Sequence, residues 1–235
     1  MKTLKRIREY FTRAEICLYL CSVAAVTASF IISGSSGYFG FAASLVGVTS
    51  LIFSAKGNPA GQALMVVFSV MYGVISFGFG YYGEMITYLG MTMPMAVWAL
   101  VSWLKNPFAE KKSEVAINSV SCTEMVLMWV FNVFLTTIFY FILAYFDTSN
   151  LILSTVSVAT SFAAVYLTAR RSEYYAIMYA MNDLVLIVLW TLASLADKSY
   201  WSVLVCFAVF FINDLYGFIS WRRMKKRQLH TKNEI

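Results

Sequence analysis

Charged residues are scarce in this sequence. Asp, Glu, Lys and Arg make up 13% of the 235 residues, whereas a soluble domain carries about a quarter. Hydrophobic residues make up 60%, and the mean hydropathy is +0.70. So few charges cannot cover the surface of a soluble protein of this length. We therefore predict an integral membrane protein. It should be all-α, because backbone groups that face lipid must find hydrogen-bond partners within their own segment.

The residues that build common catalytic and metal sites are also few. His230 is the single histidine, so no histidine cluster is available to hold a metal. Cys17 and Cys21 are one helical turn apart but do not form a CxxC motif, and we interpret them, like Cys122 and Cys206, as small apolar residues in helices. The GxSxG, HExxH and Walker motifs are absent. The sequence predicts no enzyme activity, no metal and no cofactor.

Long apolar runs are abundant instead. A bilayer crossing needs ~20 apolar residues, and we place eight crossings, at about 15–33, 38–54, 60–80, 84–104, 124–146, 150–168, 173–196 and 199–221. Turn-like segments such as Ser33–Gly37 separate them. No small-residue cleavage site follows the first run, so we expect it to remain as a crossing. None of the eight contains lysine, which excludes a retinal-type Schiff base.

The placement of basic residues predicts the orientation. With the N-terminus in the cytoplasm and eight crossings, every Lys and Arg except Lys198 falls on the cytoplasmic side, as the positive-inside rule requires. Both termini are therefore predicted to be cytoplasmic. The net charge of +6 then reflects basic segments beside anionic lipid. The run Arg222–Arg227 is expected to anchor the last crossing rather than to bind nucleic acid.

An internal repeat is visible in two pairs of motifs. Ser54-Ala55-Lys56 resembles Thr168-Ala169-Arg170, and Ser102-Trp103 resembles Ser220-Trp221. We predict two parallel three-helix repeats joined by a linking helix, with an extra helix at the N-terminus. The expected organisation is a cytoplasmic N-terminus with the extra helix (1–33), a first bundle (38–104), a cytoplasmic loop with the linking helix (105–146), a second bundle (150–221) and a basic cytoplasmic tail (222–235).

Polar residues inside the crossings are the candidates for a binding site. Asn182 and Asp183 lie near the middle of the seventh crossing, where a carboxylate costs ~2.5–3.5 kcal/mol to insert. Asn213 and Asp214 form a second such pair in the eighth. Carboxylates accept hydrogen bonds from sugar hydroxyls, and neighbouring aromatic rings can stack on a heterocycle. The sequence therefore favours a carrier for a small molecule with a ring and a sugar.

The candidate substrate-binding residues come from five crossings. They are Tyr175, Met178, Tyr179, Asn182, Asp183 and Trp190; Asn213, Asp214 and Tyr216; Gln62 and Tyr72; Trp98; and Asn132. Gln62 and Asn132 are equally well explained as contacts between helices. Pro94 and Gly217 are expected pivots for a conformational change, with ordinary helix packing as the alternative.

Several of these residues carry a resemblance to a known family. They are Gly57-Asn58-Pro59, the stretch from Pro94 through Trp98 to Asn106, Tyr216-Gly217 and Trp221-Arg222. With them the chain resembles the PnuC family of vitamin and nucleoside transporters over nearly its full length. The resemblance implies a SWEET-related fold, a homotrimer, and uptake of nicotinamide riboside or a related compound across the cell membrane. It also implies facilitated diffusion with alternating access, and trapping of the substrate by a cytoplasmic kinase.

One signature of that family is incomplete. Its nicotinamide riboside carriers have Trp-x-x-Trp-x-x-x-Asn on the helix that matches the seventh crossing, and this chain has Tyr175-x-x-Met178-x-x-x-Asn182. The resemblance implies that Asn182 contacts a ribose or an amide. Tyr175 can replace one ring, whereas Met178 cannot stack in the same way. The family also includes carriers of thiamine, riboflavin and deoxynucleosides, so the sequence does not identify which of these compounds is the substrate.

Two further functions remain as alternatives. A proton-coupled symporter could use Asp183 or Asp214 to carry the proton. A membrane scaffold that transports nothing could use the same polar residues only to join helices.

Overall fold

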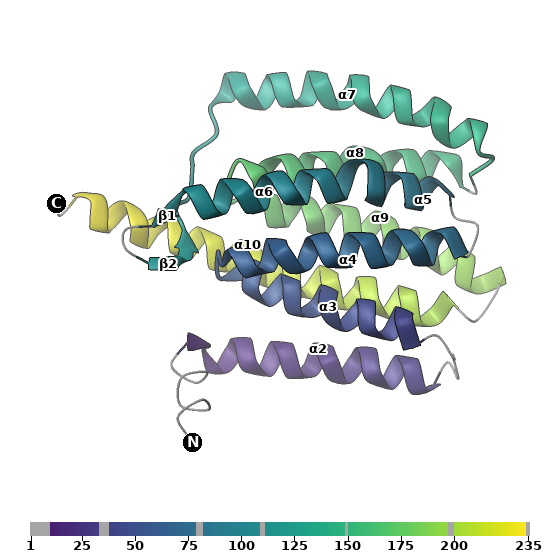
Figure 1. Ribbon diagram of the computed structural model, residues 1–235, viewed down its shortest axis with the longest axis horizontal. Helices are drawn as coiled ribbons and strands as arrows, with labels where there is room; N and C mark the ends of the chain where they lie inside the picture. Colours follow the sequence, from purple (N-terminus) through teal and green to yellow (C-terminus); the bar gives the residue numbers. More distant parts are fainter. Residues whose placement is uncertain are drawn as a thin grey trace.

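The computed structural model describes residues 10–32, 38–78, 82–108, 111–148, 150–196 and 200–233. Within these segments, eight helical stretches are long and apolar enough to cross a membrane. They lie side by side with nearly parallel axes (Figure 1). The chain is thus an all-α, multi-pass membrane protein, as predicted. The expected turn at Ser33–Gly37 and the basic residues Lys2, Lys5, Arg6, Arg8 and Lys198 lie outside the described residues.

The order of elements follows the predicted crossings. The first three are α2 (Arg13–Ile32), α3 (Tyr38–Ala55) and α4 (Pro59–Gly78), and the fourth combines α5 (Tyr82–Thr87), the π-helix η1 (Tyr88–Thr92) and α6 (Met93–Lys105). The last four are α7 (Cys122–Tyr145), α8 (Leu151–Ala169), α9 (Tyr175–Ala196) and α10 (Trp201–Asn233). The predicted boundaries agree within two residues except at the end of α10, which continues well past residue 221.

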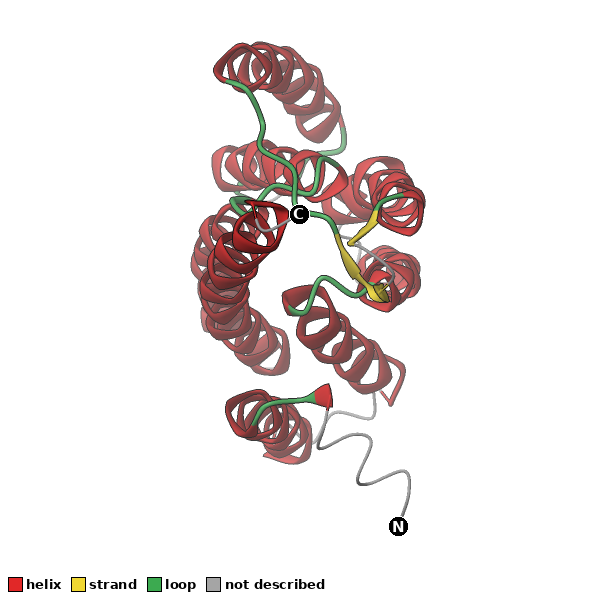
Figure 2. Ribbon diagram, turned by 90° about the vertical axis from the view of Figure 1, so that its left-hand side faces the viewer, coloured by secondary structure: helices red, strands yellow, loops and turns green. Residues whose placement is uncertain are grey.

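Two helices occupy the edges of the bundle. Seen end-on, α7 and α2 lie at opposite extremes, with the other helices between them (Figure 2). In the middle, α3 packs on α4 and α10, and α9 packs on both α8 and α10. Much of the outer surface of α7 is apolar and exposed, including Phe134 and Phe141. The polar candidates on α9 and α10 are therefore held in the interior.

The fourth crossing changes its winding just before Pro94. Proline has no backbone N–H, so it cannot donate to the carbonyl of Gly90 as a regular α-helix requires. The backbone N–H of Met93 instead donates to the carbonyl of Tyr88, five residues earlier. Such π-turns inside α-helices are frequent at functional sites. The side chains of Tyr88, Met91 and Thr92 in this turn are buried.

One end of the bundle carries most of the basic residues. We call it the basic end; it contains the last residues of α3, α6 and α8 and the C-terminal part of α10 (Figure 1). The ion pairs found among the described residues connect different elements at this end. They are Lys56–Glu15 at 3.1 Å, Lys225–Glu173 at 2.8 Å, Arg170–Glu124 and Arg227–Glu114.

The end of α6 is hydrogen-bonded to the end of α8 there. Trp103 donates from its indole Nε1 to the carbonyl of Thr168 at 2.8 Å, and Ser102 donates to the carbonyl of Ala169 at 2.7 Å. Trp103 is fully buried.

The same contact occurs between α10 and α3. Trp221 donates to the carbonyl of Ser54 at 2.8 Å, and Ser220 donates to that of Ala55 at 2.8 Å. Each Ser-Trp motif thus binds the small-residue motif of the other predicted bundle. This reciprocity supports the predicted repeat, which otherwise stays a prediction.

A short hairpin holds the extension of α10. Its strands, β1 (Pro107–Phe108) and β2 (Lys111–Val115), pair antiparallel in the connection between α6 and α7. Gln228 donates to the carbonyl of Val115 at 3.0 Å and accepts from the backbone N–H of Ile117 at 2.9 Å. The backbone N–H of Val115 in turn donates to the carbonyl of Gly57 at 2.9 Å. The predicted basic tail is therefore helical through residue 233 and is docked on the bundle.

Candidate functional site

A small interior cavity collects the polar candidates of α9 and α10. Its volume is about 30 Å³, which is room for one or two waters. The cavity is lined by Leu51, Met65, Phe68, Tyr88, Thr92, Ser161, Tyr179, Asn182, Asp183, Phe207, Phe210 and Asp214. These residues come from both predicted bundles. Four of the predicted site residues, Tyr179, Asn182, Asp183 and Asp214, are brought together here.

Asn182 is held by hydroxyl groups of α8. Its Oδ1 accepts hydrogen bonds from Ser157 at 3.2 Å, Thr160 at 2.8 Å and Ser161 at 3.0 Å. The three hydroxyls share one helix face because residues three and four apart are neighbours there. Because Oδ1 is occupied, the group of Asn182 that remains for binding a ligand is its Nδ2 amino group. This group donates hydrogen bonds.

Asp183 and Asp214 form a buried carboxyl pair. Their side chains are 3% and 4% exposed, and the two groups line the same small cavity from α9 and α10. Two ionised carboxylates have no proton to donate, so a direct hydrogen bond between them requires at least one of the two to be protonated. Asp183 Oδ2 is buried and has no hydrogen-bond partner among the described residues.

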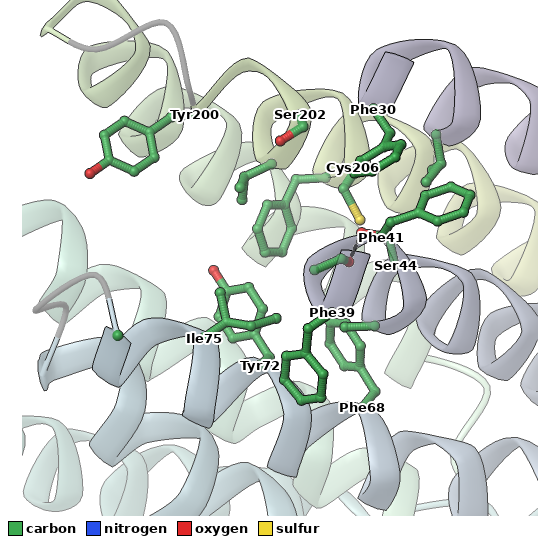
Figure 3. Close-up of a pocket in the computed structure, with 16 residues that line it drawn as sticks. Phe30, Phe39, Phe41, Ser44, Phe68, Tyr72, Ile75, Tyr200, Ser202 and Cys206 are labelled. Atoms are coloured by element: carbon green, nitrogen blue, oxygen red, sulfur yellow. Dashed lines mark hydrogen bonds between the residues drawn. The ribbon is translucent and has the colours of Figure 1, made fainter. Parts of the chain in front are cut away.

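A larger cavity lies toward the end opposite the basic end. Its volume is about 550 Å³, and it is lined by the end of α2, the start of α3, the second half of α4 and the start of α10. Figure 3 shows aromatic rings, including those of Phe39, Phe68 and Tyr72, around the space, with Ser202 and Cys206 on the opposite wall. Cavities of ~300–1,000 Å³ with mostly apolar walls are typical of small-molecule sites.

Two phenylalanines form the wall between the cavities, because Phe68 and Phe207 line both. Phe68 stacks on Tyr72 with ring centroids 5.7 Å apart, and Tyr72 lies 4.3 Å from Tyr88. Phe207 meets Phe210 at 5.8 Å. The side chains of Phe68 and Phe207 therefore separate the two cavities.

Three predicted residues serve contacts between elements outside both cavities. Gln62 donates to Ser54 Oγ at 3.2 Å. Asn132 on α7 donates to the carbonyl of Ala159 on α8 at 3.0 Å. These bonds match the structural alternative stated for both residues. Asn213 turns away from its neighbour Asp214 and donates to Ser22 Oγ of α2 at 2.9 Å.

The remaining candidates surround the site without lining the small cavity. Tyr175 packs against Trp221, with ring centroids 4.7 Å apart, on the side of the basic end. Met178 packs against the apolar cluster that contains Tyr175 and Trp221. Trp190 lies on the other side, 5.6 Å from the ring of Tyr200.

Two more candidates lie further out, and one borders the larger cavity. Tyr216 is half-buried and lies near Glu15 of α2. Trp98 is 44% exposed. Tyr72 lines the larger cavity.

Sequence reasoning missed the residues that complete the site. Ser157 and Ser161 were detectable, because with Ser154 they follow the spacing i, i+3, i+7 on one face of an apolar helix. Tyr88 and Thr92 were not, because their placement depends on the π-turn. Phe207 looked like any apolar residue of a membrane helix.

The comparisons with known proteins now decide the family. A family model described as nicotinamide mononucleotide transporter matches residues 37–223, which include every helix of the site except α2. The chain belongs to this family. The nicotinamide riboside transporter PnuC of Neisseria mucosa is 22% identical over 215 residues, covering 89% of this chain and 81% of that protein. The predicted membership of the PnuC family is confirmed.

A solved structure shows the same fold. The crystal structure of the vitamin B3 transporter PnuC aligns with a TM-score of 0.81 at 21% sequence identity, covering 93% of this chain and 94% of that one. The chain therefore has this fold, and its family and its eight long apolar helices make it a multi-pass membrane transporter.

Proposed function

We propose that this protein carries nicotinamide riboside, or a closely related nucleoside-like vitamin, across the cell membrane by facilitated diffusion. Its family supports transport of a small molecule. The observation that carries the proposal is the cavity where Asn182, Asp183 and Asp214 meet aromatic rings at the junction of the two predicted bundles. Hydrogen-bonding groups beside ring faces match a substrate made of a heterocycle and a sugar.

The two cavities give the substrate a route. A nucleoside is far too large for 30 Å³ but fits in 550 Å³. It would enter the larger cavity first and reach Asn182 after Phe68 and Phe207 rotate. The Nδ2 amino group of Asn182 then donates to the carboxamide oxygen or to a ribose oxygen. Tyr88 and Tyr179 offer ring faces close to the carboxyl pair, in place of the tryptophans of the family signature.

The closed basic end supports alternating access as the proposed transport mechanism. There Trp103, Trp221 and Tyr175 pack together, with the two tryptophan rings 5.3 Å apart. If the basic end is cytoplasmic, as the charge distribution predicts, the structure is an outward-facing state. Release into the cell requires these contacts to separate as the two bundles move. The π-helix η1 and Gly217, which lies close to Ala176 of α9, are the proposed pivots.

Trapping and assembly complete the proposal. A cytoplasmic kinase would phosphorylate the substrate, and the added charge prevents its return through an apolar cavity. We assign the exposed apolar side of α7 to lipid and to the neighbouring subunits of a homotrimer. We propose that both termini lie in the cytoplasm.

Uptake into kinase-free proteoliposomes tests the function. We expect labelled nicotinamide riboside to equilibrate across the membrane without accumulating, with or without an imposed pH gradient. Asn182→Ala should abolish uptake because the amide donor is lost. Thr191→Ala should not, since that hydroxyl is exposed and bonds only to Ile187 of its own helix.

Each alternative gives a different result in the same assay. Accumulation driven by the pH gradient, and lost in Asp183→Asn, would show a proton symporter. Uptake of thiamine or a deoxynucleoside but not of nicotinamide riboside would show a carrier of another branch. If none of these compounds shows saturable uptake, the membrane scaffold remains as the function.

A further inference from the structure

We propose that residues 115–118 form a strap that holds the basic end closed, and that the strap opens when it separates from Gln228. The strap begins at the last residue of β2 and continues toward α7. Its four consecutive backbone N–H groups each donate to a different part of the chain. This inference rests on the proposed alternating access and names a contact that must break before the basic end opens.

The first half of the strap is bound to the predicted first bundle. Val115 donates to the carbonyl of Gly57, in the turn between α3 and α4, at 2.9 Å. Ala116 donates to the carbonyl of Asn106, directly after α6, at 2.9 Å. Val115 is also fully buried. These contacts fix residues 115 and 116 to the ends of α3 and α6.

The second half is bound to the predicted second bundle. Ile117 donates to Oε1 of Gln228 on α10 at 2.9 Å. Asn118 donates to the carbonyl of Arg171, between α8 and α9, at 3.0 Å. Because residues 116 and 117 are covalently joined, the two bundles can separate at this end only if the bonds on one side of the strap break.

The strap binds the two bundles at matching turns. Gly57 and Arg171 have φ angles of +65° and +59°, the left-handed conformation that commonly ends a helix. Each donates its own N–H to the carbonyl three residues earlier, at 2.9 and 3.0 Å, and each of those carbonyls also accepts from the indole of a tryptophan of the opposite bundle. The strap therefore joins the same two helix ends that the tryptophans hold.

Gln228 is the side chain through which α10 holds the strap. Of the four acceptors of the strap, the other three are backbone carbonyls. Nε2 of Gln228 also donates to the carbonyl of Val115 at 3.0 Å and to Glu114 Oε1 at 2.9 Å. Gln228 is 5% exposed. Its contact with Val115 reaches the half of the strap that is bound to the first bundle, so these bonds stabilise the closed basic end.

Two thiol reporters measure the opening of the two ends. Ala176 is fully buried in the apolar cluster that contains Trp103 and Trp221, so Ala176→Cys, with the four native cysteines replaced, reports on the basic end. Cys206 lines the larger cavity (Figure 3) and reports on the opposite end once the three exposed cysteines are replaced by serine. The rate of reaction with a charged, water-soluble thiol reagent is measured for each reporter in lipid nanodiscs, without substrate.

Gln228→Ala removes all three hydrogen bonds of this side chain. A bond made only in the closed state stabilises that state, so its loss shifts the equilibrium toward the open basic end. We expect the cysteine at position 176 to react about tenfold faster. Cys206 should react more slowly, because alternating access closes the larger cavity when the basic end opens.

Two further variants control this result. Gln228→Glu can still accept from Ile117 but cannot donate to Val115, and we expect it to shift both rates in the same directions as Gln228→Ala. Thr231→Ala should change neither rate, because its hydroxyl bonds to the carbonyl of Arg227 on its own helix. The melting temperature in detergent checks that each variant is folded.

The outcomes separate the strap from the proposed function. A faster reaction at position 176 together with a slower one at Cys206 supports the strap. Unchanged rates in Gln228→Ala overturn it, and so does a rise at both reporters, which would show a general loosening of the bundle. Calorimetry with nicotinamide riboside on the wild type tests the proposed function separately. Absence of binding there would contradict the proposed substrate and leave the strap, which is measured without it, standing.

Discussion

The hydrogen-bonding role of Asn182 toward a ligand is determined by the residues around it. Its amide could in principle donate and accept. The hydroxyls of Ser157, Thr160 and Ser161 occupy its oxygen, so its role toward a ligand is narrowed to donation. They also fix the orientation of the side chain, which spares the ligand the entropic cost of ordering it.

Removing two of these hydroxyls should weaken binding without unfolding the protein. We expect Ser157→Ala combined with Ser161→Ala to raise the dissociation constant for nicotinamide riboside about tenfold, from the loss of two positioning hydrogen bonds. Calorimetry measures the effect, and the melting temperature in detergent checks the fold. Thr155→Ala is the matched control, because its hydroxyl bonds only to Leu151 of the same helix. An unchanged dissociation constant in the double variant would show that Asn182 needs no such support.

The sequence could single out Asn182 and Asp183, but it could not orient every polar residue. A buried carboxylate in an apolar run is expensive, and that cost alone marked Asp183 and Asp214. Asn213 and Asp214 are adjacent, however, and point about 100° apart on the helix. Only the packing shows that Asn213 faces Ser22 of α2 while Asp214 faces α9.

Among the elements, the fourth crossing is the one whose geometry bears on binding. The limits of the crossings were predictable because apolar runs end at charged and turn-forming residues. The π-turn was not, because Pro94 indicates an interrupted helix without saying how the backbone compensates. The helical end of α10 was also unpredictable from hydropathy, since it is held by Gln228 and the hairpin.

Replacing Pro94 should straighten this crossing and disturb the site. In Pro94→Ala the missing N–H is restored, so the turn can become a regular α-helix. Tyr88 and Thr92 then rotate relative to the cavity that they line. We expect about tenfold weaker binding of nicotinamide riboside with an unchanged or higher melting temperature. Pro107→Ala, in β1 at the basic end, should change neither quantity. Wild-type affinity in Pro94→Ala would mean that the π-turn does not position the site.

For the whole molecule, the most informative contact is the one in which each predicted bundle is hydrogen-bonded to the end of the other. Composition and charge placement predicted a membrane bundle and its orientation, and matching motifs predicted a repeat. They could not show that the matching motifs touch. The structure joins Ser102-Trp103 to the end of α8 and Ser220-Trp221 to the end of α3 with hydrogen bonds of 2.7–2.8 Å.

If the halves are equivalent, their tryptophans should contribute equally to stability. Trp103→Phe and Trp221→Phe each remove one buried indole hydrogen bond, which costs about 0.5–1.5 kcal/mol. The two acceptor carbonyls keep their backbone partners, the N–H of Arg171 on Thr168 and the N–H of Gly57 on Ser54. We expect both variants to lower the melting temperature in detergent by similar amounts. Trp98→Phe, at a position 44% exposed, should have little effect. A large loss in only one of the two would show that the reciprocal contacts are unequal in energy. The bundles would then separate from one side first when the basic end opens.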